Sequence, residues 1–156
     1  MMLRYFIYSC LIVVLSSCRE QNLHFLQLNE ISNSLWSTED SLVFEFSIED
    51  TLVSYDLFFE LRTTTSYSWS NIFIFTDFIF PNEKLRRDTF EFNLADPYGK
   101  WYGNKTGTTV ENSCKLYAKK VNFPLKGSYT FTIHQAMRER DLDDVLDVGL
   151  KIKKIQ

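Results

Sequence analysis

Histidine and cysteine are scarce: the 156 residues include only two histidines and three cysteines, and this limits the chemistry available to the chain. His24 lies in a polar segment and His134 in an alternating one, so a Ser–His–Asp triad or a zinc site is not expected. No HExxH, CxxC or GxSxG motif and no glycine-rich phosphate loop occurs. We expect no enzymatic activity, no metal and no cofactor. The one enzymatic alternative is a glycosidase-like carboxylate pair, whose two members would meet only in the fold.

Glycine and proline are also scarce, and basic residues do not outnumber acidic ones. Five Gly and three Pro are too few for a flexible low-complexity chain. The 17 Lys and Arg face 20 Asp and Glu without forming a basic stripe, so we expect no nucleic-acid partner. Aromatic residues, in contrast, are abundant, with 14 Phe and 8 Tyr. Residues of this kind favour β-strands.

No apolar run reaches the length of about 20 residues that a membrane-spanning helix needs. The run Tyr5–Leu15 ends in Leu15-Ser16-Ser17-Cys18, which resembles the lipobox at which bacterial lipoproteins are cut and acylated. We therefore expect residues 1–17 to be a lipoprotein signal peptide and Cys18 to carry the lipid, palmitate included. The alternative is an ordinary secretory signal with a cysteine there by chance.

The mature chain is expected to have two parts: residues 18–34, the acylated cysteine and a polar tether, and residues 35–156, the folded domain. Removal of Cys10 and acylation of Cys18 would leave Cys114 as the only thiol, so no disulfide is expected. Cys114 lies in an apolar alternating run, which is typical of a small buried side chain.

Period-two alternation of apolar residues predicts strands along most of the domain. Residues 72–80 are almost wholly apolar and predict a strand buried on both faces, whereas the charged residues 138–144 suggest one helical turn. About seven or eight short antiparallel strands predict an all-β fold, a single β-sandwich of Ig-like or jelly-roll-like type. The other predicted strand regions are residues 42–48, 54–62, 89–94, 108–121, 128–137 and 145–155.

The stretch DPYGKWYG, Asp96 to Gly103, is the most unusual loop. Asp96 before a proline can start a turn, and Gly99 and Gly103 permit positive φ. Exposing the large aromatic side chains of Trp101 and Tyr102 to water is unfavourable unless they pack against the protein or contact a ligand. The loop is thus either a structural element pinned to the core by Trp101, or a recognition loop for a partner or a sugar.

The order and spacing of several short motifs resemble the gliding-motility lipoprotein GldH family. The shared positions cover the lipobox and most of residues 94–152, whereas residues 50–90 contribute little. The shared residues are Asp96, Gly99, Trp101, Gly103, Phe123, Pro124, Gly127, Tyr129, Gln135, Met137, Arg138, Asp147, Val148, Gly149 and Leu150.

The resemblance implies a membrane-anchored, non-enzymatic lipoprotein of the cell envelope that works with other gliding or secretion proteins. By analogy we expect the outer membrane. From the residues, the possible contacts for a partner or glycan are Asp96, Gly99, Trp101, Tyr102, Gly103 and Arg138. Arg138 could instead pair with the nearby aspartates. The alternative function is carbohydrate binding, with Trp101, Tyr102 and Trp69 as stacking platforms.

Overall fold

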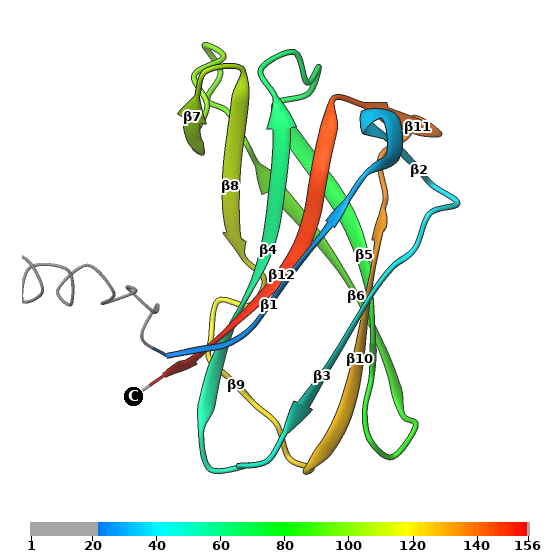
Figure 1. The fold of residues 1–156 in the computed structure, drawn as a ribbon, viewed down its shortest axis with the longest axis vertical. Coiled ribbons are helices and arrows are strands. Elements are labelled where there is room, and N and C mark those ends of the chain that lie inside the picture. The colour runs from blue at the N-terminus through cyan, green and yellow to red at the C-terminus, as the bar shows by residue number, and fades with distance from the viewer. Residues whose placement is uncertain (1–21, 156) are drawn as a thin grey trace, which may run out of the picture.

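The computed structural model describes residues 22–155, which form twelve β-strands, one 3-10 turn and no α-helix (Figure 1). No helix in this part of the chain is long and apolar enough to cross a membrane. The elements are β1 (Leu23–Glu30), η2 (Ser32–Ser34), β2 (Leu35–Ser37), β3 (Leu42–Ile48), β4 (Ser54–Thr64), β5 (Asn71–Ile79), β6 (Leu85–Asn93), β7 (Asn104–Thr106), β8 (Thr109–Lys115), β9 (Val121–Asn122), β10 (Gly127–Gln135), β11 (Asp141–Asp143) and β12 (Val145–Ile155).

The eight longest strands form two antiparallel sheets that pack face to face (Figure 1). One sheet has the order β1-β12-β4-β8, with the short β7 at its edge, and the other has the order β3-β10-β5-β6. Counted along the chain, these strands run 1-8-3-6 and 2-7-4-5, which is the jelly-roll connectivity of two Greek keys. The predicted all-β sandwich is therefore confirmed, and its topology is the jelly-roll alternative.

Aromatic rings fill much of the space between the two sheets. β4, β5 and β10 alternate buried with less buried residues, because each turns one face toward this core. The rings of Phe78, Phe123 and Tyr129 meet at centroid distances of 4.9 to 5.9 Å. The buried Tyr129 hydroxyl donates a hydrogen bond to the Leu125 carbonyl at 2.8 Å, which fixes the turn before β10. This bond ties the start of β10 to the core.

Residues 23–30 are strand β1, so the prediction that residues 18–34 form a tether is wrong for this segment. β1 pairs with β12 from Leu23 opposite Lys153 to Glu30 opposite Asp147. The folded domain consequently begins at β1, about twelve residues earlier than the predicted boundary at residue 35.

The sequence concealed β1 because its polarity is inverted relative to an ordinary edge strand. Leu26 and Leu28 are 48% and 44% exposed, whereas Gln27 is more buried and bonds to the side chain of Asn29 at 2.9 Å. His24, which lies in the segment predicted to be a tether, donates from Nε2 to a carbonyl oxygen on β3 at 2.9 Å. Pairing with β12, and not an alternation of buried apolar and exposed polar residues, therefore defines β1 as a strand.

β5 is buried on one face only, which corrects the prediction of two buried faces. Ile72 and Ile74 are fully buried, but Phe75 is 41% and Ile79 38% exposed, because no layer of the described residues covers the outer face of this sheet. The predicted helical turn at residues 138–144 is also wrong, since this segment contains β11, which pairs with β2.

Gly149 allows β1 to approach β12 closely. A Cβ atom at this position would overlap the Leu28 side chain and the Gln27 carbonyl oxygen. β12 also shifts its register against β4 between Val145 and Asp147. The Asp-Val-Gly-Leu segment therefore has a structural explanation in strand packing.

The predicted lipidation site, Cys18, lies outside the described residues. Cys114 is a free, half-buried thiol, and burial, with a smaller contribution from Glu60, raises its pKa to about 12. Such a thiol is protonated at neutral pH and is a poor nucleophile.

Phe78 offers a direct test of the aromatic core. We expect Phe78→Ala to lower the free energy of unfolding by about 3–5 kcal/mol, because it leaves a cavity among packed rings. Leu52→Ala is the matched control, since Leu52 is 93% exposed, and it should change stability by less than about 0.5 kcal/mol. Urea unfolding measures both, and equal effects would contradict the described packing.

Candidate functional site

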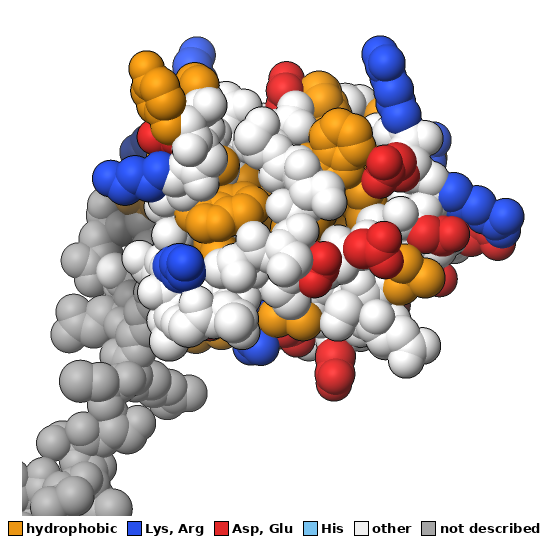
Figure 2. Space-filling view, turned by 90° about the horizontal axis from the view of Figure 1, so that it is seen from above, with side chains coloured by type: hydrophobic (Ala, Val, Ile, Leu, Met, Phe, Trp, Pro, Cys, Tyr) orange, Lys and Arg blue, Asp and Glu red, His pale blue; other side chains and the backbone are white. Residues whose placement is uncertain are grey.

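Three loops lie at the same end of the sandwich, the upper end in Figure 1, and we call this the loop end. They are residues 65–70 between β4 and β5, residues 94–103 between β6 and β7, and residues 136–140 between β10 and β11. Seen from above, apolar side chains reach the surface of this end in separate patches, and acidic side chains gather to one side (Figure 2). Exposed aromatic residues here are Tyr98 at 96%, Tyr102 at 64% and Trp69 at 40%.

Asp96 organises the DPYGKWYG loop as the sequence predicted, by starting a turn. Its Oδ1 accepts hydrogen bonds from the backbone N–H groups of Tyr98 at 2.8 Å and Lys100 at 2.9 Å. Its own N–H donates to the Lys100 carbonyl at 2.9 Å. Gly99 closes the turn with φ at +82°, a region that glycine enters without steric cost. Asp96 and Gly99 therefore shape the loop from within.

Trp101 and Gly103 also have structural roles. Trp101 is half-buried, packs against the hydrophobic core and forms an isolated β-bridge with Ala95. At Gly103 an added Cβ atom would overlap the backbone of Glu111 and the side chain of Asn112 on β8. Of the two interpretations, core attachment therefore applies to Trp101, while Tyr102 remains exposed for contact.

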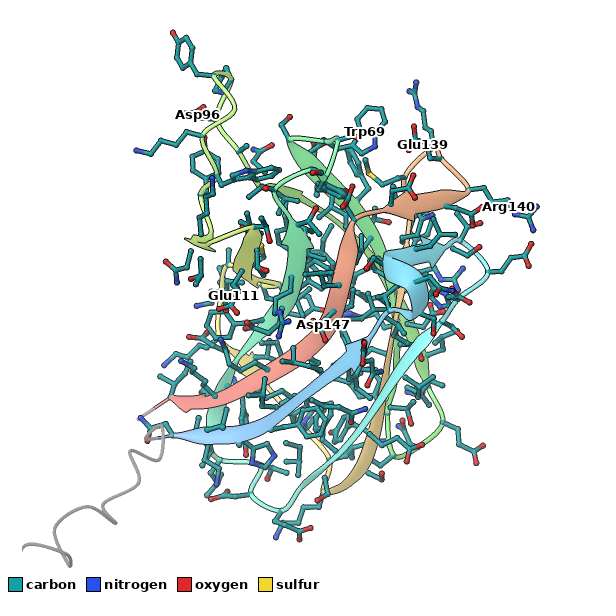
Figure 3. The ribbon with its side chains drawn as sticks, turned by 45° about the horizontal axis from the view of Figure 1, so that its top comes forward. Trp69, Asp96, Glu111, Glu139, Arg140 and Asp147 are labelled. Carbon is teal, nitrogen blue, oxygen red and sulfur yellow. The ribbon has the colours of Figure 1, made fainter. Side chains whose placement is uncertain are left out.

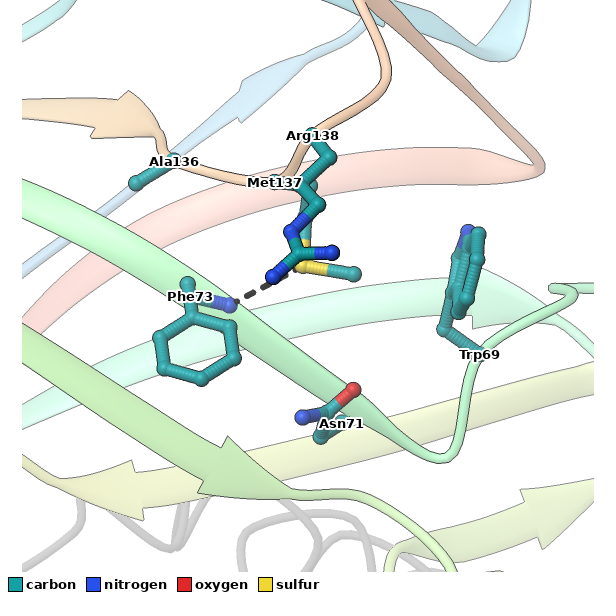
Figure 4. A pocket seen from close by; sticks show the side chains of 6 residues that line it. All are labelled: Trp69, Asn71, Phe73, Ala136, Met137 and Arg138. Atoms are coloured by element: carbon teal, nitrogen blue, oxygen red, sulfur yellow. Dashed lines mark hydrogen bonds between the residues drawn. The ribbon is translucent and has the colours of Figure 1, made fainter.

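A pocket of about 500 Å³ lies between the start of β5 and the chain leaving β10. Trp69 stands on one side of it, and Met137 with Arg138 on the other (Figure 4). A second pocket, of about 300 Å³, shares Ala136 and Met137 as lining residues and continues along the outer face of the sheet. We call the two together the β5–β10 groove. Its lining residues that matter here are Trp69, Phe73, Phe75, Met137, Arg138 and His134.

The backbone at the floor of the groove is weakly satisfied. The last sheet bond between the two strands runs from Ala136 N to Phe73 O at 2.8 Å, after which the chain turns away toward β11. The N–H of Phe73 then donates to Met137 Sδ at 3.3 Å (Figure 4). A thioether is a weak acceptor on a flexible side chain.

Arg138 makes no ion pair with the aspartates, contrary to the expected alternative. It is exposed and has no polar partner within residues 22–155. Two of the nearby aspartates bond elsewhere: Asp144 accepts from Thr64, and Asp147 pairs with Arg62 at 3.1 Å. Arg140, two residues on, bonds to Glu39 at 2.7 Å.

The other charged groups around the groove are engaged. Trp69 Nε1 donates to Glu139 at 3.3 Å, and Asn71 Nδ2 donates to Glu91 at 2.8 Å. Farther along, two hydrogen bonds from Arg87 lower the pKa of Asp77, and His134 Nε2 lies 3.5 Å from the same carboxylate. No cluster of three or more His, Cys, Asp or Glu in residues 22–155 could hold a metal ion.

The predicted contact residues separate into two groups at the loop end. Figure 3 shows Asp96 on one side of this end and Trp69 with Glu139 on the other. Asp96, Gly99, Trp101, Tyr102 and Gly103 remain together in their loop, whereas Arg138 lines the groove with Trp69. The sequence did not point to Asn71, Phe73 or Ala136, although Met137 and Arg138 belong to a motif noted for its resemblance.

Gly103 distinguishes a structural from a binding role for the DPYGKWYG loop. We expect Gly103→Ala to reduce the free energy of unfolding by about 1–3 kcal/mol, because the added methyl group overlaps β8. Tyr98→Ala, in the same loop, should leave stability unchanged because its ring is almost fully exposed. Thermal unfolding of both variants measures this. If Gly103→Ala were as stable as the wild-type protein, close packing against β8 would not require glycine at this position.

Comparison with solved structures finds a carbohydrate-binding module specific for non-crystalline cellulose. It is 12% identical, and the alignment covers 83% of this chain and 85% of that chain with a TM-score of 0.36.

Two sequence relatives cover most of this chain. A protein of Christiangramia forsetii described as a gliding motility lipoprotein GldH homolog is 32% identical over 158 residues, covering 96% of this chain and 94% of that protein. The gliding motility lipoprotein GldH of Flavobacterium johnsoniae is 31% identical over 128 residues, covering 78% and 79%. The family model for the GldH lipoprotein matches residues 24–152. This chain therefore belongs to the GldH lipoprotein family.

Proposed function

We propose that this protein is a non-enzymatic lipoprotein, anchored through Cys18 in the outer membrane, that binds other envelope proteins of the gliding machinery and its associated secretion apparatus. Family membership supports the lipid anchor and the role in gliding motility. The observation that carries the binding role is the exposure of Trp69, Tyr98 and Tyr102 at one end of a compact sandwich.

The anchor would hold the domain close to the bilayer. β1 begins at Leu23, only five residues after Cys18. Five backbone steps span at most about 18 Å when fully extended, less than the thickness of a bilayer. In Figure 1 the described chain enters toward the lower end of the long axis, and the loop end is at the top. The loop end would therefore point away from the attachment point.

A binding role fits the surface better than catalysis does. Aromatic side chains are enriched in protein–protein interfaces relative to the rest of the protein surface, and exposed apolar patches mark interaction sites. Each histidine is already engaged, His24 with the Ser47 carbonyl and His134 with Asp77. Neither lies in a nucleophile–base pair of the described residues, so we infer that the domain presents a binding surface.

Cys18→Ser tests the anchor in the source bacterium. Wild-type protein and the control variant Cys114→Ser should incorporate an alkyne-tagged palmitate and fractionate with the membrane, because each retains Cys18. Cys18→Ser should do neither, because the lipid-bearing thiol is absent. Metabolic labelling followed by gel fluorescence measures incorporation, and labelled Cys18→Ser protein would refute the assignment.

A further inference from the structure

The β5–β10 groove combines a weakly bonded backbone N–H with a positive charge that has no ion-pair partner in residues 22–155. β10 leaves the sheet at Ala136, so the stretch Asn71–Phe73 of β5 has no strand beside it on that side in the described residues. The Phe73 N–H points to this position and is bonded only by the Met137 thioether. A carbonyl oxygen is a better acceptor than a thioether, so an extended chain could displace the Met137 side chain.

The walls of the groove are suited to large apolar side chains. Trp69 is 40% exposed and lines the groove, and its indole N–H donates to Glu139 at 3.3 Å. Phe75, 41% exposed, continues the apolar surface along β5 past Phe73. Met137 lies between them and can adjust its shape because its side chain is unbranched.

The charged side chains around the groove indicate which charge the ligand should carry. Asp77 is paired with Arg87, whereas Glu139 and Glu91 accept hydrogen bonds from the neutral groups of Trp69 and Asn71. Arg138 is the charged side chain of the groove without a partner in residues 22–155. Arg138 lies on the same side of the pocket as Met137, whose Sδ accepts the hydrogen bond from the Phe73 N–H (Figure 4). An exposed guanidinium without an ion-pair partner is suited to a bidentate bond with a carboxylate.

We propose that the β5–β10 groove binds an extended segment of a partner protein, in which an acidic side chain lies beside an aromatic or large aliphatic one. The segment adds its backbone to β5 beyond the end of β10, its carboxylate bonds to Arg138, and its apolar side chain packs on Trp69. This inference deepens the proposed function, because it rests on the protein having a protein partner. A neutral sugar would use the Trp69 face but would leave the Arg138 charge unmatched.

The test uses the full acylated protein in mild detergent and an array of capped peptides that carry Asp beside Phe, Trp or Leu. Counterparts with Asn in place of Asp are the matched probes. We expect the Asp peptides to bind about 10- to 100-fold more tightly than the Asn peptides, since the bond to Arg138 is charge-assisted. Binding should also shift the Phe73 amide resonance, which a contact remote from β5 would not do.

Two arginine variants separate a specific contact from general attraction. Arg138→Gln should lower affinity for the Asp peptides by the same factor, whereas Arg140→Gln should not, because Arg140 is already bonded to Glu39. Trp69→Ala should abolish binding while unfolding at the wild-type temperature. Three results would overturn the proposal: an unchanged affinity of the Asp peptides for Arg138→Gln, a failure of every peptide to bind, or binding of a polysaccharide panel alone.

Capture of partners from the native envelope distinguishes this inference from the proposed function. If wild-type protein captures an envelope protein and the Trp69→Ala, Arg138→Gln double variant does not, both stand. If the double variant captures it equally well, the groove assignment fails and the proposed function survives. If the wild-type protein captures nothing, the proposed function fails, and the groove assignment fails with it.

Discussion

Packing of aromatic rings between two sheets is the constraint on which the other features of this domain depend. Phe78, Phe123 and Tyr129 contact one another across the core, and the Tyr129 hydroxyl fixes the turn that starts β10. β10 then runs to Gln135, and the last bond to β5 is from Ala136 N to Phe73 O. The groove at the loop end is thus a consequence of where a core-anchored strand stops.

The same framework separates the two ends of the molecule. Pairing of β1 with β12 brings the start of the folded chain to within five residues of Cys18, so a lipid on that cysteine would leave the domain little freedom. The loop end carries the exposed rings of Trp69 and Tyr102 and the unpaired Arg138. In the proposed function, attachment and recognition would therefore belong to different parts of one sandwich.

Period-two hydropathy was sufficient to predict the fold class, because most strands have one face in the core, as Leu42–Ile48 does. It failed for β1, whose leucines face outward and whose Gln27 faces inward, so only pairing reveals the strand. It overestimated the burial of Phe75, because hydropathy along the chain does not reveal which face of a sheet lacks a covering layer. The groove was beyond prediction because its key bond joins Phe73 to Met137, 64 residues apart.

The most direct test of a partner at the groove is photo-crosslinking in the living envelope. A photoreactive phenylalanine analogue replaces Trp69 in the acylated protein, and the same analogue at Leu52, a highly exposed position between β3 and β4, is the control. The account predicts a discrete heavier adduct from position 69 and none from position 52. Identical adducts from both positions, or no adduct from position 69, would contradict it.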